Sequence, residues 1–183
     1  MAGGFDGLGE MRITREYLDL QKKLHATGTY GRGVDVPECM RHIRSCIQTG
    51  ETLLDYGCGQ GHLSRACADW GLPIFEYDPA IPGKDELPAP ADIVVCADVL
   101  EHIEPECIDA VLTHLQALTR KILIAVIATR PAVKTLADGR NAHVLLMTPM
   151  QWFDKLSERF TPMIYENRHV LGRGVLFVGG VKE

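Results

Sequence analysis

A glycine loop in the segment LLDYGCGQGHLSRA, residues 53–66, constrains the fold of this chain most strongly. Three glycines at alternate positions follow a short apolar run, which indicates a turn from a buried strand into a helix. The dinucleotide pattern G-x-G-x-x-G would need a glycine where His62 stands, and the Gly-Lys-Ser/Thr of a P-loop is absent. Asp55 ends the apolar run, and a carboxylate there would repel a pyrophosphate but could bind an ammonium group. The loop therefore suits a zwitterionic ligand without phosphate.

Apolar runs alternate with helical patterns along the chain. Strands are expected at 52–55, 73–78, 92–100, 121–128, 162–167 and 174–181. Helices are expected over 13–24 and 36–47, from the glycine loop to Trp70, over 105–118, and from Pro149 onward, after a capping box at Thr148. This order predicts an α/β fold with a doubly wound, mostly parallel sheet and a C-terminal antiparallel hairpin. Ligands of such sheets bind beyond the carboxyl ends of the strands.

Length and charge limit the domain organisation and the partners. The 183 residues fit a single domain over 13–183, in which 13–49 form N-terminal helices and a lid. The glycine-rich residues 1–12 are expected to be disordered. The net charge of −5 gives no support to a nucleic-acid partner. The apolar runs are too short to cross a membrane and the N-terminus lacks a signal-peptide pattern, which predicts a cytoplasmic protein.

Six cysteines are scattered along the chain without a CxxC pair. No group of cysteines and histidines has the spacing of a zinc site, so the sequence predicts no metal site. Buried, reduced thiols are the simplest interpretation of the cysteines.

The segment LLDYGCGQG resembles motif I, D/E-x-G-x-G-x-G, of the class I S-adenosylmethionine (SAM)-dependent methyltransferases. Asp78 follows Asp55 by 23 residues and ends the second expected strand, where that family has the carboxylate that holds both ribose hydroxyls. The segment ADIVVCADVLEHI is similar to the fourth strand and following turn of the small-molecule branch, which includes the ubiquinone-biosynthesis type enzymes. The resemblance extends over about residues 50–183 and implies SAM as the cofactor.

The resemblance also implies a set of cofactor-binding residues and one departure in the fold. The family has a seven-stranded sheet, but only thirteen residues, several of them prolines, separate Asp78 from Asp92, where a helix and a third strand would stand. We therefore expect a loop there and a sheet that is shortened around the usual third strand. Asp85 in this loop is the best match for the family's adenine-binding carboxylate. The expected cofactor-binding residues are Asp55, Gly57, Cys58, Gly59, Gly61, Asp78, Pro79, Asp85, Asp98 and Val99.

Candidate residues for catalysis and for substrate binding come from two loops and one turn. His102 resembles a family histidine that often lies near the transferred methyl group. His143 belongs to the polar loop 129–146 and is a candidate general base near neutral pH. The candidate substrate-binding residues are Tyr30, Arg140 and Asn141. A purely structural role for each of these residues stays open.

These observations predict a SAM-dependent methyltransferase that acts on a small molecule at oxygen, nitrogen or carbon by in-line displacement. ADVLEH stands where nucleic-acid amino-methyltransferases carry Asn/Asp-Pro-Pro-aromatic, and the Pro-Cys nucleophile of cytosine C5 methylation is missing from that region. Two other interpretations stay open. One is a catalytically silent protein of this fold that binds the cofactor or a partner chain, and the other is a nicotinamide-dependent oxidoreductase.

Overall fold

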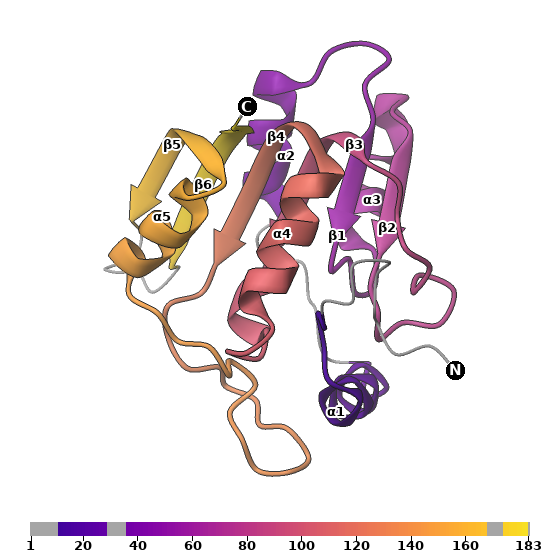
Figure 1. Ribbon diagram of the computed structural model, residues 1–183. Helices are drawn as coiled ribbons and strands as arrows, with labels where there is room; N and C mark the ends of the chain where they lie inside the picture. Colours follow the sequence, from indigo (N-terminus) through magenta and orange to yellow (C-terminus); the bar gives the residue numbers. More distant parts are fainter. Residues whose placement is uncertain (1–10, 29–35, 168–173, 183) are drawn as a thin grey trace.

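The computed structural model describes residues 11–28, 36–167 and 174–182. These residues contain one sheet with the strand order β2-β1-β3-β4-β6-β5 (Figure 1). The strands are β1 (Leu53–Tyr56), β2 (Ile74–Tyr77), β3 (Ala91–Ala97), β4 (Thr119–Ile127), β5 (Phe160–Asn167) and β6 (Val175–Val181). The helices are α1 (Arg15–His25), α2 (Val36–Cys46), α3 (His62–Ala66), α4 (Ile108–Leu118) and α5 (Pro149–Ser157), with 3-10 turns η1 (Ala68–Trp70) and η2 (Leu100–His102). None of the described helices is long and apolar enough to span a membrane.

The direction of the strands confirms the predicted fold class. β1 pairs in parallel with both β2 and β3, and β3 pairs in parallel with β4. β6 is antiparallel to β4 and to β5, so the chain ends in the predicted hairpin. The chain leaves β1 for β2 on one side and returns to β3 on the other. The strand order therefore reverses between β1 and β3, where open α/β sheets bind ligands.

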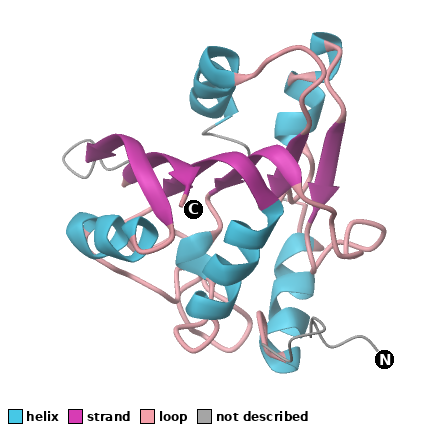
Figure 2. Ribbon diagram, turned by 45° about the horizontal axis from the view of Figure 1, so that its top comes forward, coloured by secondary structure: helices cyan, strands magenta, loops and turns pink. Residues whose placement is uncertain are grey.

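Helices cover both faces of the sheet, as Figure 2 shows. Side chains of β3 point alternately to the two faces and pack on helices at each one. Val94 and Cys96 belong to the buried cluster with α4 and α5. Ile93 and Val95 belong to the cluster with α2 and α3 on the other face. Apart from Asp92 near its start, β3 is apolar at every position, as is typical of a strand that is buried between two layers of helices.

The structure confirms the shortened edge and corrects two helix boundaries. Residues 78–90 form neither helix nor strand, and Asp78 N–H donates to Lys84 O at 2.8 Å across a turn. The described part of the sheet therefore has six strands and ends at β2. The helix after the glycine loop breaks into α3 and η1, and α4 begins at Ile108 rather than at Pro105.

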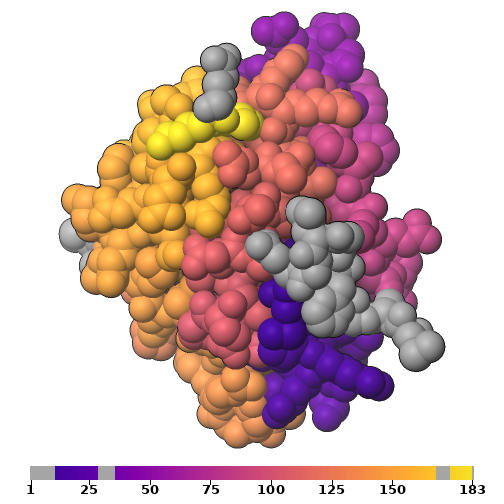
Figure 3. Space-filling view, in the orientation of Figure 1, coloured from indigo at the N-terminus to yellow at the C-terminus, as the bar shows by residue number. Residues whose placement is uncertain are grey.

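α1 lies beside the loop that follows β4, at the end of the molecule to which the parallel strands point (Figures 1 and 3). One cluster of buried apolar side chains joins the two segments: Tyr17, Leu20, Leu24, Leu136 and Ala142. Thr14 caps α1, and its N–H and hydroxyl both donate to the Glu104 carboxylate at 2.9 and 2.8 Å. These contacts fix α1 near the carboxyl ends of the strands. Tyr30, predicted in a lid, lies outside the described residues.

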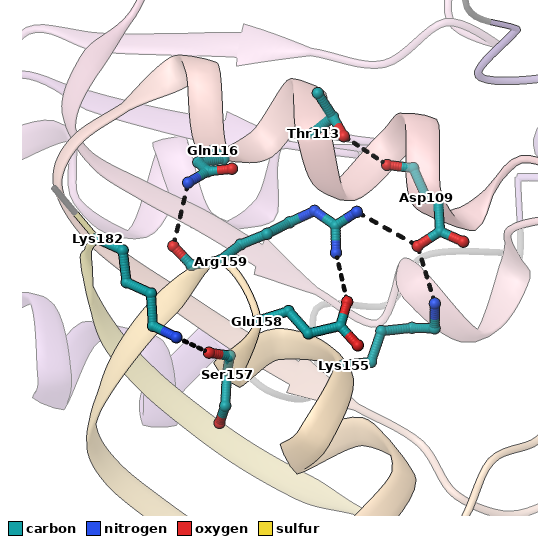
Figure 4. A network of polar contacts seen from close by, with 8 residues as sticks. All are labelled: Asp109, Thr113, Gln116, Lys155, Ser157, Glu158, Arg159 and Lys182. Carbon is teal, nitrogen blue, oxygen red and sulfur yellow. Dashed lines mark hydrogen bonds and ion pairs between the residues drawn. The ribbon is translucent and has the colours of Figure 1, made fainter.

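A network of polar contacts joins α4 to α5 (Figure 4). Asp109 accepts from Lys155 Nζ at 2.9 Å and from Arg159 at 3.3 Å, and Gln116 donates to the backbone carbonyl of Arg159. The predicted capping box at Thr148 begins α5. Because exposed ion pairs contribute at most about 1 kcal/mol each, most of the energy that holds α5 comes from its buried apolar side.

Candidate active site

A cavity lies at the carboxyl ends of β1, β2 and β3, and α1 forms part of its wall. The predicted site residues that line it are Asp55, Gly57, Cys58, Gly59, Asp78, Pro79, Asp98, Val99 and His102. The predicted residues that do not line it are Gly61, Asp85, Arg140, Asn141 and His143. The fold thus brings three separate segments of the sequence to one place, namely the glycine loop, the residues after β2 and the turn after β3.

The glycines of the loop serve two different purposes. Gly57 and Gly61 have φ angles of 73° and 72°. A Cβ on Gly57 would lie 2.4 Å from Val99 Cγ2, and one on Gly61 would lie 2.2 Å from Glu76 Oε1. These two glycines therefore allow close packing beneath the loop. Gly59 has a φ of 50°, but the nearest atom to its Cβ would be 3.7 Å away, so its backbone is open toward the cavity.

Asp78 is buried and ties the glycine loop to the turn after β2. Its Oδ2 accepts from Gly59 N–H at 3.0 Å, and its Oδ1 accepts from Ala80 N–H at 2.9 Å. A carboxylate has about four lone-pair sites, so each oxygen keeps the capacity to accept one more hydrogen bond. Asp78 can therefore stabilise the loop and still accept hydrogen bonds from hydroxyls of a ligand.

Asp55 is buried at the end of β1 and lines the cavity. Burial, followed by the charges of Glu76 and Asp78, raises the pKa of its carboxyl to about 7, although Lys84 acts in the opposite direction. Lys84 forms an ion pair with Glu76 at 2.9 Å and donates to Gly59 O at 3.2 Å. The Asp55 carboxyl thus ionises near neutral pH, and a cationic group of a ligand would stabilise its charged form.

The turn after β3 combines a strained backbone with buried ionisable groups. Asp98 is the only non-glycine residue with positive φ, at 59°, in the described part of the chain, and such strain is common at functional sites. Glu101 is fully buried, and its Oε1 accepts from Ala128 N–H at 2.7 Å. Burial, followed by the charge of Asp98, raises the pKa of Glu101 well above its usual value. Burial lowers the pKa of His102 to about 4, and its Nδ1 donates to Ala142 O at 2.7 Å.

The loop between β4 and α5 brings His143 against the ring of His102. The two ring centres are 4.7 Å apart, with one edge facing the other ring. The Asn141 side chain is occupied inside the loop, because its Nδ2 donates to Ala132 O and its Oδ1 accepts from Ala132 N–H, each at 2.9 Å. The same Oδ1 accepts from His143 N–H at 2.9 Å. Asn141 therefore orders the loop that carries His143.

Arg140 and Asp85 lie away from the cavity. Arg140 Nε donates to Asp138 at 2.7 Å, and its guanidinium lies 5.5 Å from the centre of the Tyr17 ring. Asp85 is exposed, and its Oδ1 accepts from Gly83 N–H at 3.1 Å. The predicted roles of Arg140 in substrate binding and of Asp85 in adenine binding gain no support from this arrangement.

Polar residues of the N-terminal segment line the cavity but were not predicted as site residues. They are Arg12, Tyr17, Gln21 and His25. Tyr17 Oη and Gln21 Nε2 are buried and have no hydrogen-bond partner among the described residues. Burial raises the pKa of Tyr17 to about 12, so it carries a neutral hydroxyl. Gln21 follows Tyr17 by one helical turn, so it lies on the same, largely apolar face of α1. A polar residue on that face was the one feature of the sequence that could have indicated a site there.

A family model described as a methyltransferase domain matches residues 30–161. The chain belongs to this family. The match confirms the class of SAM-dependent methyltransferases, which was predicted from the glycine loop, Asp78 and the DVLEHI segment. No curated protein matches the sequence of this methyltransferase significantly.

Solved structures of methyltransferases share the fold at low sequence identity. The 1,6-didemethyltoxoflavin-N1-methyltransferase of Burkholderia thailandensis, with S-adenosylhomocysteine (SAH) and 1,6-didemethyltoxoflavin bound, is 15% identical, with a TM-score of 0.69. The match covers 92% of this chain and 90% of that one. The magnesium protoporphyrin IX methyltransferase of Synechocystis PCC 6803 with bound SAH is 16% identical, with a TM-score of 0.57, and the match covers 100% of this chain and 90% of that one. These likenesses confirm the fold of this methyltransferase over nearly its whole length.

Proposed function

We propose that this methyltransferase transfers the methyl group of SAM to a small-molecule acceptor, with both molecules bound in the cavity at the carboxyl ends of β1, β2 and β3. The observation that carries the proposal is that the glycine loop, Asp78 and the turn after β3 all line this cavity. These are the segments in which the sequence resembles the family. The two neighbours bind SAH on the same fold, which supports the same cofactor here.

In this proposal the cofactor extends along the glycine loop from Asp55 to Asp78. The open backbone at Gly59 allows close approach of the methionine part. The ammonium group faces Asp55, whose charged form it stabilises, and the ribose hydroxyls donate to the remaining lone pairs of Asp78. Val99 lies against the cofactor on the β3 side.

The acceptor occupies the part of the cavity next to α1 in this proposal. The Tyr17 hydroxyl and the Gln21 amide are buried polar groups there, and they suit a small polar molecule rather than a nucleic acid. Both neighbours act on small molecules, according to their names, which supports the same class of acceptor. The accepting atom is an oxygen, a nitrogen or a carbon.

Methyl transfer from a sulfonium is an in-line displacement, which depends mainly on proximity and orientation of the two reactants. A base helps only where the nucleophile loses a proton. His102 is better placed than His143 to contact the acceptor, because His102 lines the cavity and is neutral at pH 7. His143 acts on the acceptor only through His102 or after the loop moves.

Calorimetric titration with SAM and with NAD tests the proposed function. We expect one SAM to bind per chain and NAD to give no binding heat. Tight binding of NAD instead of SAM would support the oxidoreductase. An assay of SAH formation with a panel of small-molecule acceptors then tests for catalysis. SAM binding without turnover, together with a co-purifying partner chain, would support the catalytically silent protein.

The affinity for SAM is expected to rise with pH between 5 and 7. Asp55 holds its proton up to a pKa of about 7 in the free protein, and only the carboxylate attracts the ammonium group. Below that pKa, the affinity should fall by up to about tenfold per pH unit. Calorimetry at several pH values measures this slope. The Asp55→Asn variant should bind SAM weakly and with a much flatter pH profile.

The stability of the free protein should show the opposite trend with pH. The folded pKa of Asp55 lies above its unfolded value, so the folded state binds this proton more tightly than the unfolded state. The contribution of Asp55 to the free energy of unfolding is therefore full at low pH and decreases as pH rises from about 4 to about 7. Denaturation of the wild type and of Asp55→Asn measures this difference. Equal pH profiles of the two proteins would contradict the role given to Asp55.

A further inference from the structure

Four potential metal ligands converge beside the cavity, and the methyl-transfer proposal gives a role to His102 alone among them. Each of Asp98, Glu101, His102 and His143 offers one ligand atom, and these four atoms all lie within 4.8 Å of one another. Three of the residues come from the turn after β3, and the fourth comes from the loop after β4, in the region below these strands in Figure 1.

Glu101 gives the cluster a buried oxygen that needs a partner. The side chain is fully buried, and its Oε1 accepts from Ala128 N–H at 2.7 Å. The second oxygen, Oε2, is buried without a hydrogen-bond partner among the described residues. A buried carboxylate oxygen without a partner costs free energy, and a bound cation would remove that cost.

The two histidines are held in the orientation that metal-binding histidines adopt. His102 Nδ1 lies 2.7 Å from Ala142 O, and His143 Nδ1 lies 2.6 Å from Arg130 O. A carbonyl oxygen only accepts, so each ring donates from Nδ1, and Nε2 is the ring nitrogen that would bind a metal ion. Such a second hydrogen bond to a backbone carbonyl fixes the tautomer and the ring plane of metal-ligating histidines. Ala142, which precedes His143, therefore orients the ring of His102, so the loop after β4 holds both histidines in place.

We propose that Asp98, Glu101, His102 and His143 bind a divalent transition-metal ion such as Mn²⁺, Fe²⁺, Co²⁺ or Zn²⁺. Two imidazole nitrogens and two carboxylate oxygens suit these ions, whereas Mg²⁺ and Ca²⁺ bind mostly oxygen ligands. Ligands at about 2.1 Å from one ion lie about 3 to 4.2 Å from each other. A small movement of the exposed Asp98 side chain would close the cluster around the ion.

The spacing of cysteines and histidines did not predict this site, because half of its ligands are carboxylates and His143 lies 41 residues after His102. The ion would face the cavity, since Asp98 and His102 both line it. An open coordination position on that side would bind an oxygen of the acceptor and lower the pKa of an acceptor hydroxyl. This last consequence rests on the proposed methyl transfer, but the metal site itself does not.

Binding of Mn²⁺ to the full chain, purified with a chelator and without an affinity tag, tests the site. Electron paramagnetic resonance counts free Mn²⁺ during a titration, and the absorption of Co²⁺ reports its coordination. We expect one saturable Mn²⁺ per chain. The Glu101→Gln and His143→Ala variants should each lose at least about tenfold in affinity, the loss typical of even second-layer substitutions at metal sites.

Matched variants keep the test decisive. Glu101→Gln retains an oxygen that accepts from Ala128 N–H, so it removes the ligand and keeps the hydrogen bond. His42→Gln, on α2 and outside the cluster, should bind Mn²⁺ as the wild type does. Absence of saturable Mn²⁺, Co²⁺ or Zn²⁺ binding, or equal affinity in Glu101→Gln and wild type, would overturn the proposal. Calorimetry with SAM on the same samples separates this outcome from failure of the proposed function, because metal binding is measured without SAM.

Discussion

Replacing Asp78 with alanine is expected to weaken SAM binding about 10- to 100-fold, because hydrogen bonds to a charged group contribute about 1.5–3 kcal/mol. The substitution removes the acceptor that we propose for the ribose hydroxyls. It also removes the hydrogen bond from Gly59 N–H that holds the glycine loop. Both effects act on the same ligand, so calorimetric titration with SAM should show the loss directly.

Asp85→Ala is the matched control for Asp78→Ala. Both carboxylates belong to the loop that replaces the usual third strand, but Asp85 is exposed and does not line the cavity. We expect Asp85→Ala to bind SAM as tightly as the wild type. If Asp85→Ala lost affinity and Asp78→Ala kept it, the cofactor would lie elsewhere than we propose. Thermal unfolding of both variants without ligand shows whether either substitution disturbs the fold itself.

Gly57→Ala is expected to lower the free energy of unfolding by about 2–5 kcal/mol. This loss is the sum of the cost of overpacking and the cost of a side chain at positive φ. The new Cβ would lie 2.4 Å from Val99 Cγ2 and 2.9 Å from Val99 Cγ1 at a φ of 73°. Val99 follows β3, so the clash pushes the glycine loop away from the central strands. Chemical denaturation without ligand measures the loss.

Two variants separate the steric part of this loss from the backbone part. Gly59→Ala has a similar positive φ but only one atom near its Cβ, at 3.7 Å, so it should cost only the backbone strain of about 1–2 kcal/mol. Adding Val99→Ala to Gly57→Ala should recover part of the stability, because it removes both clashing methyl groups. Equal losses for Gly57→Ala and Gly59→Ala would contradict the close packing of the loop on Val99.

The fold was predictable because apolar runs mark the strands in the sequence. The alternation of these runs with helical patterns indicates a mostly parallel sheet. The run that became β3 is apolar at nearly every position, which is typical of a strand between two helical layers. Boundaries were less accurate, since Pro105 lies in a turn before α4 instead of at its first position. Proline restricts φ in both settings, so the residue alone does not distinguish a helix start from the turn before it.

The residues that line the cavity were predictable where a motif lies at the end of a strand. Asp55, Asp78 and Asp98 meet because the carboxyl ends of parallel strands share one edge of the sheet. The contribution of Tyr17 was not predictable in this way, because helical periodicity shows which face is buried but not where the helix docks. The contact between His102 and His143 depends on the path of a loop that no local pattern determines.

A crystal structure of the protein with SAH bound tests the central claim most directly. We expect density for SAH in the cavity at the carboxyl ends of β1, β2 and β3, with the ribose hydroxyls within hydrogen-bond distance of Asp78 and the amino group near Asp55. The sulfur should face the part of the cavity between α1 and His102. Density for SAH at any other place, or an empty cavity at saturating SAH, would contradict the proposed function.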